Sequence, residues 1–252
     1  MIGIFDSGIG GLSVFREIRK ILPDESYIYY SDNAHCPYRE KSIDYIIGRS
    51  RDITEFLLEK GADIIVVACN TATAAAIATL RQEYPHVPFI GMEPAIKPAV
   101  RKTRTGTVGV LATAGTLKAD KYLNTREKWA ENVKIVEHVG QGFVELVEKG
   151  KLEGLETEAT VRASIRPLLD EGSDVIVLGC THYPFLSGVI TKVATGLYPD
   201  REICIIDPAP AVARHLAEVM TEKGMLSNNG FSISLYSSGD DTSLKNIYNT
   251  LL

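Results

Sequence analysis

Residues 63–73 read Asp-Ile-Ile-Val-Val-Ala-Cys-Asn-Thr-Ala-Thr, and residues 174–184 read Asp-Val-Ile-Val-Leu-Gly-Cys-Thr-His-Tyr-Pro. The two stretches align without a gap at a spacing of 111 residues, so Cys69 and Cys180 occupy matched positions. Their apolar runs do not alternate with polar residues, which is typical of central parallel strands covered on both faces. The repeat therefore predicts two similar α/β units, each with a cysteine where a buried strand ends.

A second, looser repeat supports the same division. Residues 3–8 (Gly-Ile-Phe-Asp-Ser-Gly) resemble residues 109–115 (Gly-Val-Leu-Ala-Thr-Ala-Gly), each a strand followed by a small polar residue and a glycine. We expect the chain to cross between the units near 92–97 and 207–210. The predicted fold is α/β, with residues 1–95 plus 208–252 forming one lobe and residues 96–207 the other. We expect mostly parallel sheets, a pseudo-twofold axis relating the lobes, and an active site in the cleft between them.

Short β-branched runs alternate with longer amphipathic stretches along the whole chain. This alternation predicts βαβ units. We expect strands at 2–5, 27–32, 63–68, 88–91, 106–112, 133–139, 174–178, 203–206 and 231–236. We expect helices at 11–22, 43–60, 72–84, 94–102, 117–131, 142–150, 156–171, 186–197, 209–223 and 241–250.

The composition narrows the class of protein. The 252 residues are 45% hydrophobic and 23% charged, with a formal net charge of −5, as in ordinary soluble globular proteins. The negative charge argues against a nucleic-acid partner, and no apolar stretch approaches the length of a membrane span. The first residues form a strand-like run without a basic region or signal core, so we expect a cytoplasmic protein. Four cysteines are too few for a disulfide scaffold and should remain thiols.

Cys69 and Cys180 are the strongest candidates for chemistry. Each is predicted to end a buried strand just before a helix begins, where free N–H groups stabilise a thiolate or a bound carboxylate. A single cysteine in such a place is usually a small core residue. Two at matched positions, one followed by Asn-Thr and the other by Thr-His, indicate catalysis. Cys36 and Cys204 are expected to be structural.

Other candidates lie close to these cysteines in the predicted fold. Asp6 and Ser7 leave the first strand ahead of glycines that allow a ligand to approach the backbone, although a simple glycine-softened turn would look the same. His182 could relay the proton of Cys180, or it could be a structural residue whose hydrogen bonds are made within a turn. A zinc site would have to collect His35, Cys36, Cys69, Cys180 and His182, but metal-binding spacings are absent, so no metal is expected.

Several motifs together resemble the cofactor-independent aspartate/glutamate racemase superfamily, and within it the glutamate racemases. They are residues 4–12 (Ile-Phe-Asp-Ser-Gly-Ile-Gly-Gly-Leu), 37–38 (Pro-Tyr), 68–73 (Ala-Cys-Asn-Thr-Ala-Thr), 91–95 (Gly-Met-Glu-Pro-Ala), 109–116 (Gly-Val-Leu-Ala-Thr-Ala-Gly-Thr) and 179–184 (Gly-Cys-Thr-His-Tyr-Pro). The resemblance runs almost end to end. It implies an isomerase that interconverts L- and D-glutamate, needs no cofactor and supplies D-glutamate for peptidoglycan synthesis.

The resemblance also implies roles for individual residues. Cys69 and Cys180 would be the two catalytic bases, with Asp6 assisting Cys69 and with His182 and Glu148 supporting Cys180. The match at Glu148 rests on the Phe-Val-x-x-Val-Glu pattern of residues 143–148. Contacts to the substrate are implied for Asp6, Ser7, Pro37, Tyr38, Arg39, Asn70, Thr71, Thr113, Thr116, Thr181 and His182.

The chain departs from the family at two places, and three alternatives stay open. Arg39 stands where the family commonly has glycine, and Gln141-Gly142 replace a common Cys-Pro. A racemase for aspartate or another amino acid, a non-catalytic two-lobed amino-acid binding protein and a redox dithiol protein are the alternatives. We expect glutamate as the small-molecule partner, no nucleic acid, no membrane and a homodimer.

Overall fold

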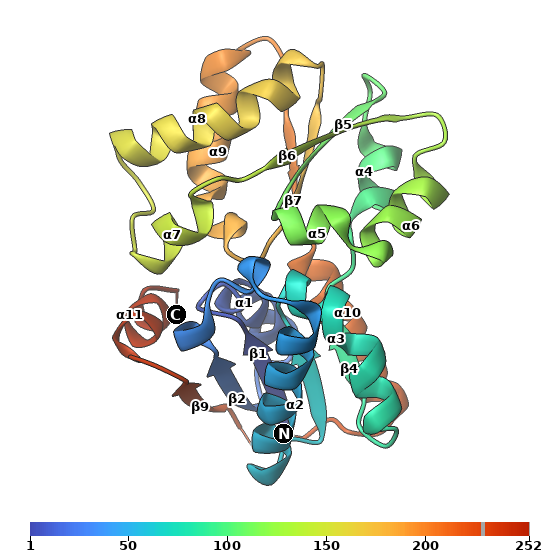
Figure 1. Ribbon diagram of the computed structural model, residues 1–252, viewed down its shortest axis with the longest axis vertical. Helices are drawn as coiled ribbons and strands as arrows, with labels where there is room; N and C mark the ends of the chain where they lie inside the picture. The colour runs from blue at the N-terminus through green and yellow to red at the C-terminus, as the bar shows by residue number, and fades with distance from the viewer. Residues whose placement is uncertain (228–229, 252) are drawn as a thin grey trace. The chain divides into compact units, whose positions relative to one another are not determined.

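The computed structural model describes residues 1–227 and 230–251. It divides the chain into two compact units, Met1–Met92 with Ala209–Leu252 and Glu93–Pro208, which we call the first and second units. The predicted tail of the first lobe, 208–252, includes residues 228, 229 and 252, which lie outside the described residues. Each unit is built on its own sheet (Figure 1).

The first unit contains a five-stranded parallel sheet in the order β4-β3-β1-β2-β9. Its strands are β1 (Ile2–Asp6), β2 (Ser26–Ser31), β3 (Ile64–Val67), β4 (Phe89–Gly91) and β9 (Ser232–Ser237). Its α-helices are α1 (Leu12–Ile21), α2 (Ile43–Glu59), α3 (Asn70–Glu83), α10 (Ala209–Glu222) and α11 (Thr242–Leu251), and its 3₁₀ turns are η1 (Asn33–His35) and η2 (Tyr38–Glu40). The C-terminal strand β9 pairs with β2 along its full length, so the sheet contains strands from both the N-terminal and the C-terminal parts of the chain.

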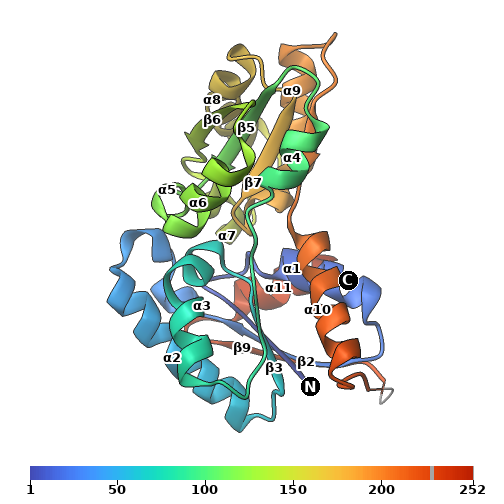
Figure 2. The ribbon, with the colours of Figure 1, turned by 90° about the vertical axis from the view of Figure 1, so that its right-hand side faces the viewer.

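Helices cover both faces of this sheet, which explains the continuous apolar strands. Every residue of β1 and β3 is buried. Figure 2 shows α2 and α3 on one side of the sheet and α10 on the other, and α1 packs against α10. The sheet residues Phe5, Ile65 and Val67 meet Leu57 of α2 and Leu80 of α3 in one buried cluster.

The strand order places two loops at the most favourable position for a ligand. The chain leaves β1 through α1 to reach β2 on one side, and leaves β3 through α3 to reach β4 on the other side. The carboxyl ends of β1 and β3 therefore form the topological switch point of the sheet, where α/β proteins bind ligands. Asp6 is the last residue of β1 and Cys69 follows β3 by two residues.

The second unit repeats this plan with a four-stranded parallel sheet in the order β6-β5-β7-β8. Its strands are β5 (Thr107–Ala112), β6 (Lys134–Val139), β7 (Val175–Gly179) and β8 (Cys204–Ile206). Its helices are α4 (Ile96–Lys102), α5 (Ala114–Lys118), α6 (Asp120–Trp129), α7 (Phe143–Glu148), α8 (Leu155–Asp170) and α9 (Ser187–Leu197), with the 3₁₀ turn η3 (Tyr183–Leu186).

In this unit the switch point lies between β5 and β7. Helices α8 and α9 pack together on one side of the sheet, and α4 and α6 lie on the other (Figures 1 and 2). Thr113 directly follows β5 and Cys180 directly follows β7. Ala112 and Gly179, the final residues of these strands, are register partners. The side chains after them consequently emerge next to each other.

The prediction of two α/β units with parallel sheets is confirmed, and so are all nine predicted strands, with no end shifted by more than one residue. The single helix predicted at 117–131 is wrong, because α5 and α6 occupy this region and α5 begins at Ala114. Ala119 between them is extended, with φ −75° and ψ 137°. No glycine or proline marks this break, so the periodic pattern concealed it. None of the described helices is long and apolar enough to cross a membrane.

Candidate active site

Cys69 caps the N-terminus of α3, as predicted for a cysteine at a strand-to-helix turn. Its Sγ accepts a hydrogen bond from the backbone N–H of Ala72 at 3.4 Å. Its thiol also lies 3.6 Å from Oγ of Ser7, to which it donates. Only 5% of Cys69 is exposed. Both the amide and the positive end of a 14-residue helix favour the thiolate over the thiol.

The loop after β1 is fixed by its own hydrogen bonds. The N–H of Gly8 donates to Oδ1 of Asp6 at 2.8 Å, and the hydroxyl of Tyr29 donates to the carbonyl of Gly8 at 3.0 Å. Gly11 permits this packing, because a Cβ there would lie 2.7 Å from both Cβ of Asp6 and the Tyr29 hydroxyl. Asp6 is fully buried. The structure therefore holds Asp6 and Ser7 rigidly on the strand adjacent to that of Cys69.

The loop after β2 carries Pro37, Tyr38 and Arg39. Pro37 precedes η2, and Tyr38 is buried in the same cluster as Cys69. The Arg39 guanidinium lies 3.4 Å from Oε1 of Glu40. The family resemblance implied these residues as substrate contacts, and the structure shows in addition that Tyr38 packs against the core.

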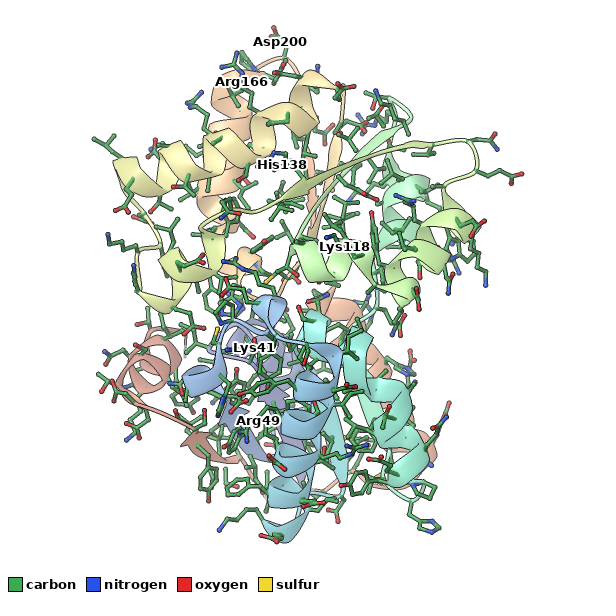
Figure 3. The ribbon with its side chains drawn as sticks, in the orientation of Figure 1. Lys41, Arg49, Lys118, His138, Arg166 and Asp200 are labelled. Atoms are coloured by element: carbon green, nitrogen blue, oxygen red, sulfur yellow. The ribbon has the colours of Figure 1, made fainter. Side chains whose placement is uncertain are left out.

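Asp32 and Arg49 belong to this region and were missed by the sequence analysis. The Tyr38 hydroxyl donates to Oδ2 of Asp32 at 2.6 Å, and Arg49 of α2, labelled in Figure 3, donates to both oxygens of the same carboxylate. Burial opposes ionisation of Asp32, but the hydrogen bonds from Arg49 and Tyr38 outweigh it and hold its pKa below the usual value. Burial and the Asp32 charge raise the pKa of Tyr38, so this phenol stays protonated. The position of Asp32 directly after β2, like that of Asp6 at the end of β1, was the available signal.

Asn70 and Thr71 form the first turn of α3 and are half-buried. The Oδ1 atom of Asn70 is buried and has no hydrogen-bond partner among the described residues. Buried polar atoms in native proteins nearly always have a partner. An unpartnered acceptor in the turn that follows Cys69 is suited to receive a donor from a bound molecule, such as an ammonium group.

In the second unit a chain of three side chains begins at Cys180. Nδ1 of His182 lies 3.8 Å from Sγ of Cys180, and its Nε2 lies 2.6 Å from Oε1 of Glu148 on α7. Cys180 and Thr181 are buried, and the side chain of His182 is only 3% exposed. Burial alone would lower the pKa of His182, but hydrogen bonds and charge interactions with Cys180 and Glu148 raise it well above the ordinary value. The imidazolium form is therefore favoured beside the thiol.

The turn that carries His182 depends on a close approach at Gly140. The Tyr183 hydroxyl donates to the Gly140 carbonyl at 3.3 Å, and a Cβ at Gly140 would lie 2.6 Å from the tyrosine ring. Tyr183 also packs edge-on against Phe143 of α7, with ring centroids 4.9 Å apart. These contacts dock η3 on α7, which brings His182 and Glu148 together. Unlike Cys69, Cys180 is followed by a 3₁₀ turn, and its α-helix begins only at Ser187.

Thr113 and Thr116 complete the candidate residues of the second unit. Thr113 caps α5 by accepting from the N–H of Thr116 at 3.3 Å, and the two hydroxyl oxygens are 2.9 Å apart. Both are buried at the end of β5, next to the strand that leads to Cys180. Paired hydroxyls can donate to a carboxylate without adding charge.

Comparisons with known proteins identify the family of this chain. The model of the Asp/Glu/hydantoin racemase family matches residues 2–216. A glutamate racemase from Stutzerimonas stutzeri is 48% identical over 239 residues, covering 95% of this chain and 89% of the relative. A crystal structure of a glutamate racemase from Bacillus anthracis is similar with a TM-score of 0.87 and 32% identity, covering 99% of this chain and 92% of that one.

A second solved structure extends the comparison to a complex. Escherichia coli glutamate racemase, solved with L-glutamate and the activator UDP-MurNAc-Ala, is similar with a TM-score of 0.86 and 34% identity. The similarity covers 99% of this chain and 94% of that one. The chain described here belongs to the Asp/Glu/hydantoin racemase family, and the relatives that it matches along almost its whole length are glutamate racemases.

Proposed function

We propose that this amino-acid racemase interconverts L- and D-glutamate, with the thiols of Cys69 and Cys180 as the two bases, one for each face of Cα. Family membership and the near-complete coverage of glutamate racemases support the substrate. The observation that carries the mechanism is the matched placement of the cysteines, each at the switch point of a parallel sheet. A racemase without a cofactor needs one group to remove the α-proton and another to supply it.

Cys69 is prepared for proton transfer by fixed dipoles. The Ala72 N–H at 3.4 Å and the N-terminus of α3 stabilise its thiolate, while Ser7 accepts from its thiol form at 3.6 Å. A free thiol has a pKa near 8.5, so some stabilisation of this kind is needed for a useful thiolate fraction at neutral pH. Asp6, buried beside Ser7, is the proposed assisting group on this side.

Cys180 is prepared by a charged neighbour instead. An imidazolium at His182 stabilises the Cys180 thiolate, and the Glu148 carboxylate at 2.6 Å stabilises the imidazolium. Neutral histidine in a buried site would offer no such charge. His182 and Glu148 are therefore proposed to act together on the protonation state of Cys180.

The remaining polar groups suit the ends of an amino acid. The hydroxyls of Ser7, Thr113, Thr116 and Thr181 can donate to carboxylate oxygens, and they can stabilise the enediolate that forms when Cα loses its proton. The unpartnered Oδ1 of Asn70 can accept from the ammonium group. Backbone or side-chain contacts from Pro37, Tyr38, Arg39 and Thr71 are part of the same proposal.

The proposed cellular role follows from the substrate. D-glutamate made by this protein would enter peptidoglycan synthesis in the cytoplasm and so support cell shape.

We propose a homodimer as the working assembly. Light scattering of the purified protein at several concentrations measures this directly, and a monomer at all of them would contradict it.

The deciding experiment uses purified protein without added cofactor in deuterium oxide. Circular dichroism should show each glutamate enantiomer converging on the racemate, and nuclear magnetic resonance should show solvent deuterium at Cα of the product. Aspartate supplied at the same concentration should react far more slowly. Faster turnover of aspartate, or inversion without deuterium incorporation, would refute the proposal.

A further inference from the structure

Asp32 is a fully buried carboxylate at the end of β2 that the proposed mechanism does not use. Nε and Nη2 of Arg49 donate to its two oxygens at 3.0 and 2.8 Å, and the Tyr38 hydroxyl donates at 2.6 Å. The hydroxyl of Ser238 provides a further hydrogen bond. Arginine is suited to this task, because its planar fork matches both oxygens of a carboxylate.

This network ends at Cys69. Tyr38 and Cys69 belong to one buried cluster, η2 contacts α3, and the charge of a Cys69 thiolate acts on the Tyr38 hydroxyl. The phenol has one proton, and that proton is committed to Asp32. The hydrogen bond from its hydroxyl to Asp32 consequently fixes the direction of the Tyr38 side chain within the cluster that contains Cys69.

Arg49 holds the other side of the carboxylate. Its side chain is 20% exposed and extends from α2, whereas Asp32 is 0% exposed. A buried carboxylate needs a paired cation and hydrogen bonds to remain ionised. If Arg49 were absent, Asp32 would either take up a proton or draw its remaining donors toward itself, and Tyr38 would shift in both cases.

We propose that Arg49 is a positioning residue for Cys69, acting through Asp32 to seat the Tyr38 ring against the thiol. Arg49 touches neither the thiol nor, in the proposed mechanism, the substrate. Its effect is on the access to Cys69 and on the reactivity of that thiol. The inference rests on the proposed function only in that Cys69 is taken as a base.

The same helix provides a matched control. Arg51, two residues further along α2, makes a comparable two-pronged pair with Glu83, at 2.7 and 2.6 Å. That pair is exposed, with 43% of the Arg51 side chain and 37% of Glu83 accessible to solvent. Arg51→Gln therefore removes an ion pair from α2 without affecting Asp32 or Tyr38.

The test measures the alkylation of each thiol by iodoacetamide in the absence of substrate, using peptide mass spectrometry to follow Cys69 and Cys180 separately. In Arg49→Gln we expect the Cys69 rate to change at least about threefold, a shift of roughly 0.65 kcal/mol. The Cys180 rate should remain constant and serves as the internal reference. The kcat/KM for racemisation should fall about tenfold or more, as expected when a reacting group is misplaced.

Three further variants make the test specific. Arg51→Gln should change neither rate nor kcat/KM. Arg49→Lys, which keeps the charge but loses the fork, should recover part of the loss. Tyr38→Phe, which keeps the ring but removes its link to Asp32, should reproduce the change at Cys69 and keeps the proposal testable if Arg49→Gln does not fold.

Unchanged Cys69 alkylation in Arg49→Gln and Tyr38→Phe would overturn the proposal, and so would equal changes at Cys69 and Cys180. The alkylation measurement does not depend on turnover, so it remains valid if the protein does not racemise glutamate. A selective change at Cys69 with unaltered racemisation would support the positioning role and would instead refute Cys69 as a base.

Discussion

Replacing Glu148 by glutamine tests the charge chain behind Cys180. The amide has nearly the shape of the carboxylate but no charge, so the side chain can remain in place while its attraction for the imidazolium is lost. The Nε2–Oε1 distance is 2.6 Å, with 3% of the His182 side chain and 22% of Glu148 exposed. A hydrogen bond to a charged partner contributes about 1.5–3 kcal/mol, and the partial exposure of Glu148 favours the lower end.

A loss of about 1.4 kcal/mol changes the ratio of charged to neutral imidazole about tenfold. The hydrogen bonds of His182 raise its pKa, so the charged form should persist to higher pH in the wild type than in Glu148→Gln. The raised pKa of His182 also determines how its contribution to stability depends on pH. The contribution of a histidine with a raised pKa is complete below its unfolded pKa, about 6.5, and disappears as the pH rises through the folded pKa. The variant should lose most stability near pH 6 and little at alkaline pH.

Proton nuclear magnetic resonance of the His182 ring, titrated in both proteins, measures the shift directly. Glu218→Gln is the control, because His215 and Glu218 on α10 are 3.7 Å apart and 56% and 70% exposed. Such a surface pair contributes little, so Glu218→Gln should leave the titration of His182 unchanged. If His182 titrates at the same pH with and without Glu148, the carboxylate does not sustain its charge and the reasoning fails.

Other predictions address the thiols, the packing of η3 and the chemistry. Cys69→Ala and Cys180→Ala should each nearly abolish racemisation in a polarimetric assay, yet each should still eliminate a Cβ leaving group from one enantiomer of a glutamate analogue; elimination from both enantiomers by either variant would contradict the two-base reaction. Gly140→Ala should lower the free energy of unfolding by about 1–3 kcal/mol through its clash with Tyr183, whereas Gly188→Ala, where nothing lies within 4 Å of the added carbon, should not destabilise the fold. Exhaustive dialysis against a metal chelator should leave turnover intact, and activity restored only by added metal would refute the cofactor-free mechanism.

The sheets could be predicted from the sequence because each central strand is a continuous apolar run. Ile64–Val67 and Val175–Gly179 are covered by helices on both faces. A strand buried on both faces consists almost entirely of apolar residues, and such a run can be recognised in the sequence. The two cysteines could be located from the sequence for the same reason, because each stands at the end of one of these apolar runs. Breaks between helices were less visible, because Ala119 ends α5 through its backbone angles alone.

The supporting groups of the site could not be derived from local pattern. Glu148 and His182 are 34 residues apart, and their contact needs α7 and η3 to dock. Only the family resemblance suggested that pair. Arg49 lies in a helix with several charged residues, and nothing in its spacing distinguishes it from Arg51, which faces solvent. The difference between them arises from which side of α2 faces Asp32.

The two cysteines are held by different kinds of partner, and this has a kinetic consequence. The Ala72 amide at Cys69 cannot titrate, whereas His182 at Cys180 can. In the proposed reaction one thiol gains the α-proton of the substrate and the other thiol gives up its own proton. Each turnover therefore leaves the proton of the unliganded protein on the opposite thiol, and the protein alternates between two resting forms. A charged His182 favours the form whose proton is on Cys69. Acidity therefore biases this alternation through His182 beside Cys180, and the two enantiomers should saturate the protein at different maximal velocities even though their equilibrium constant is one.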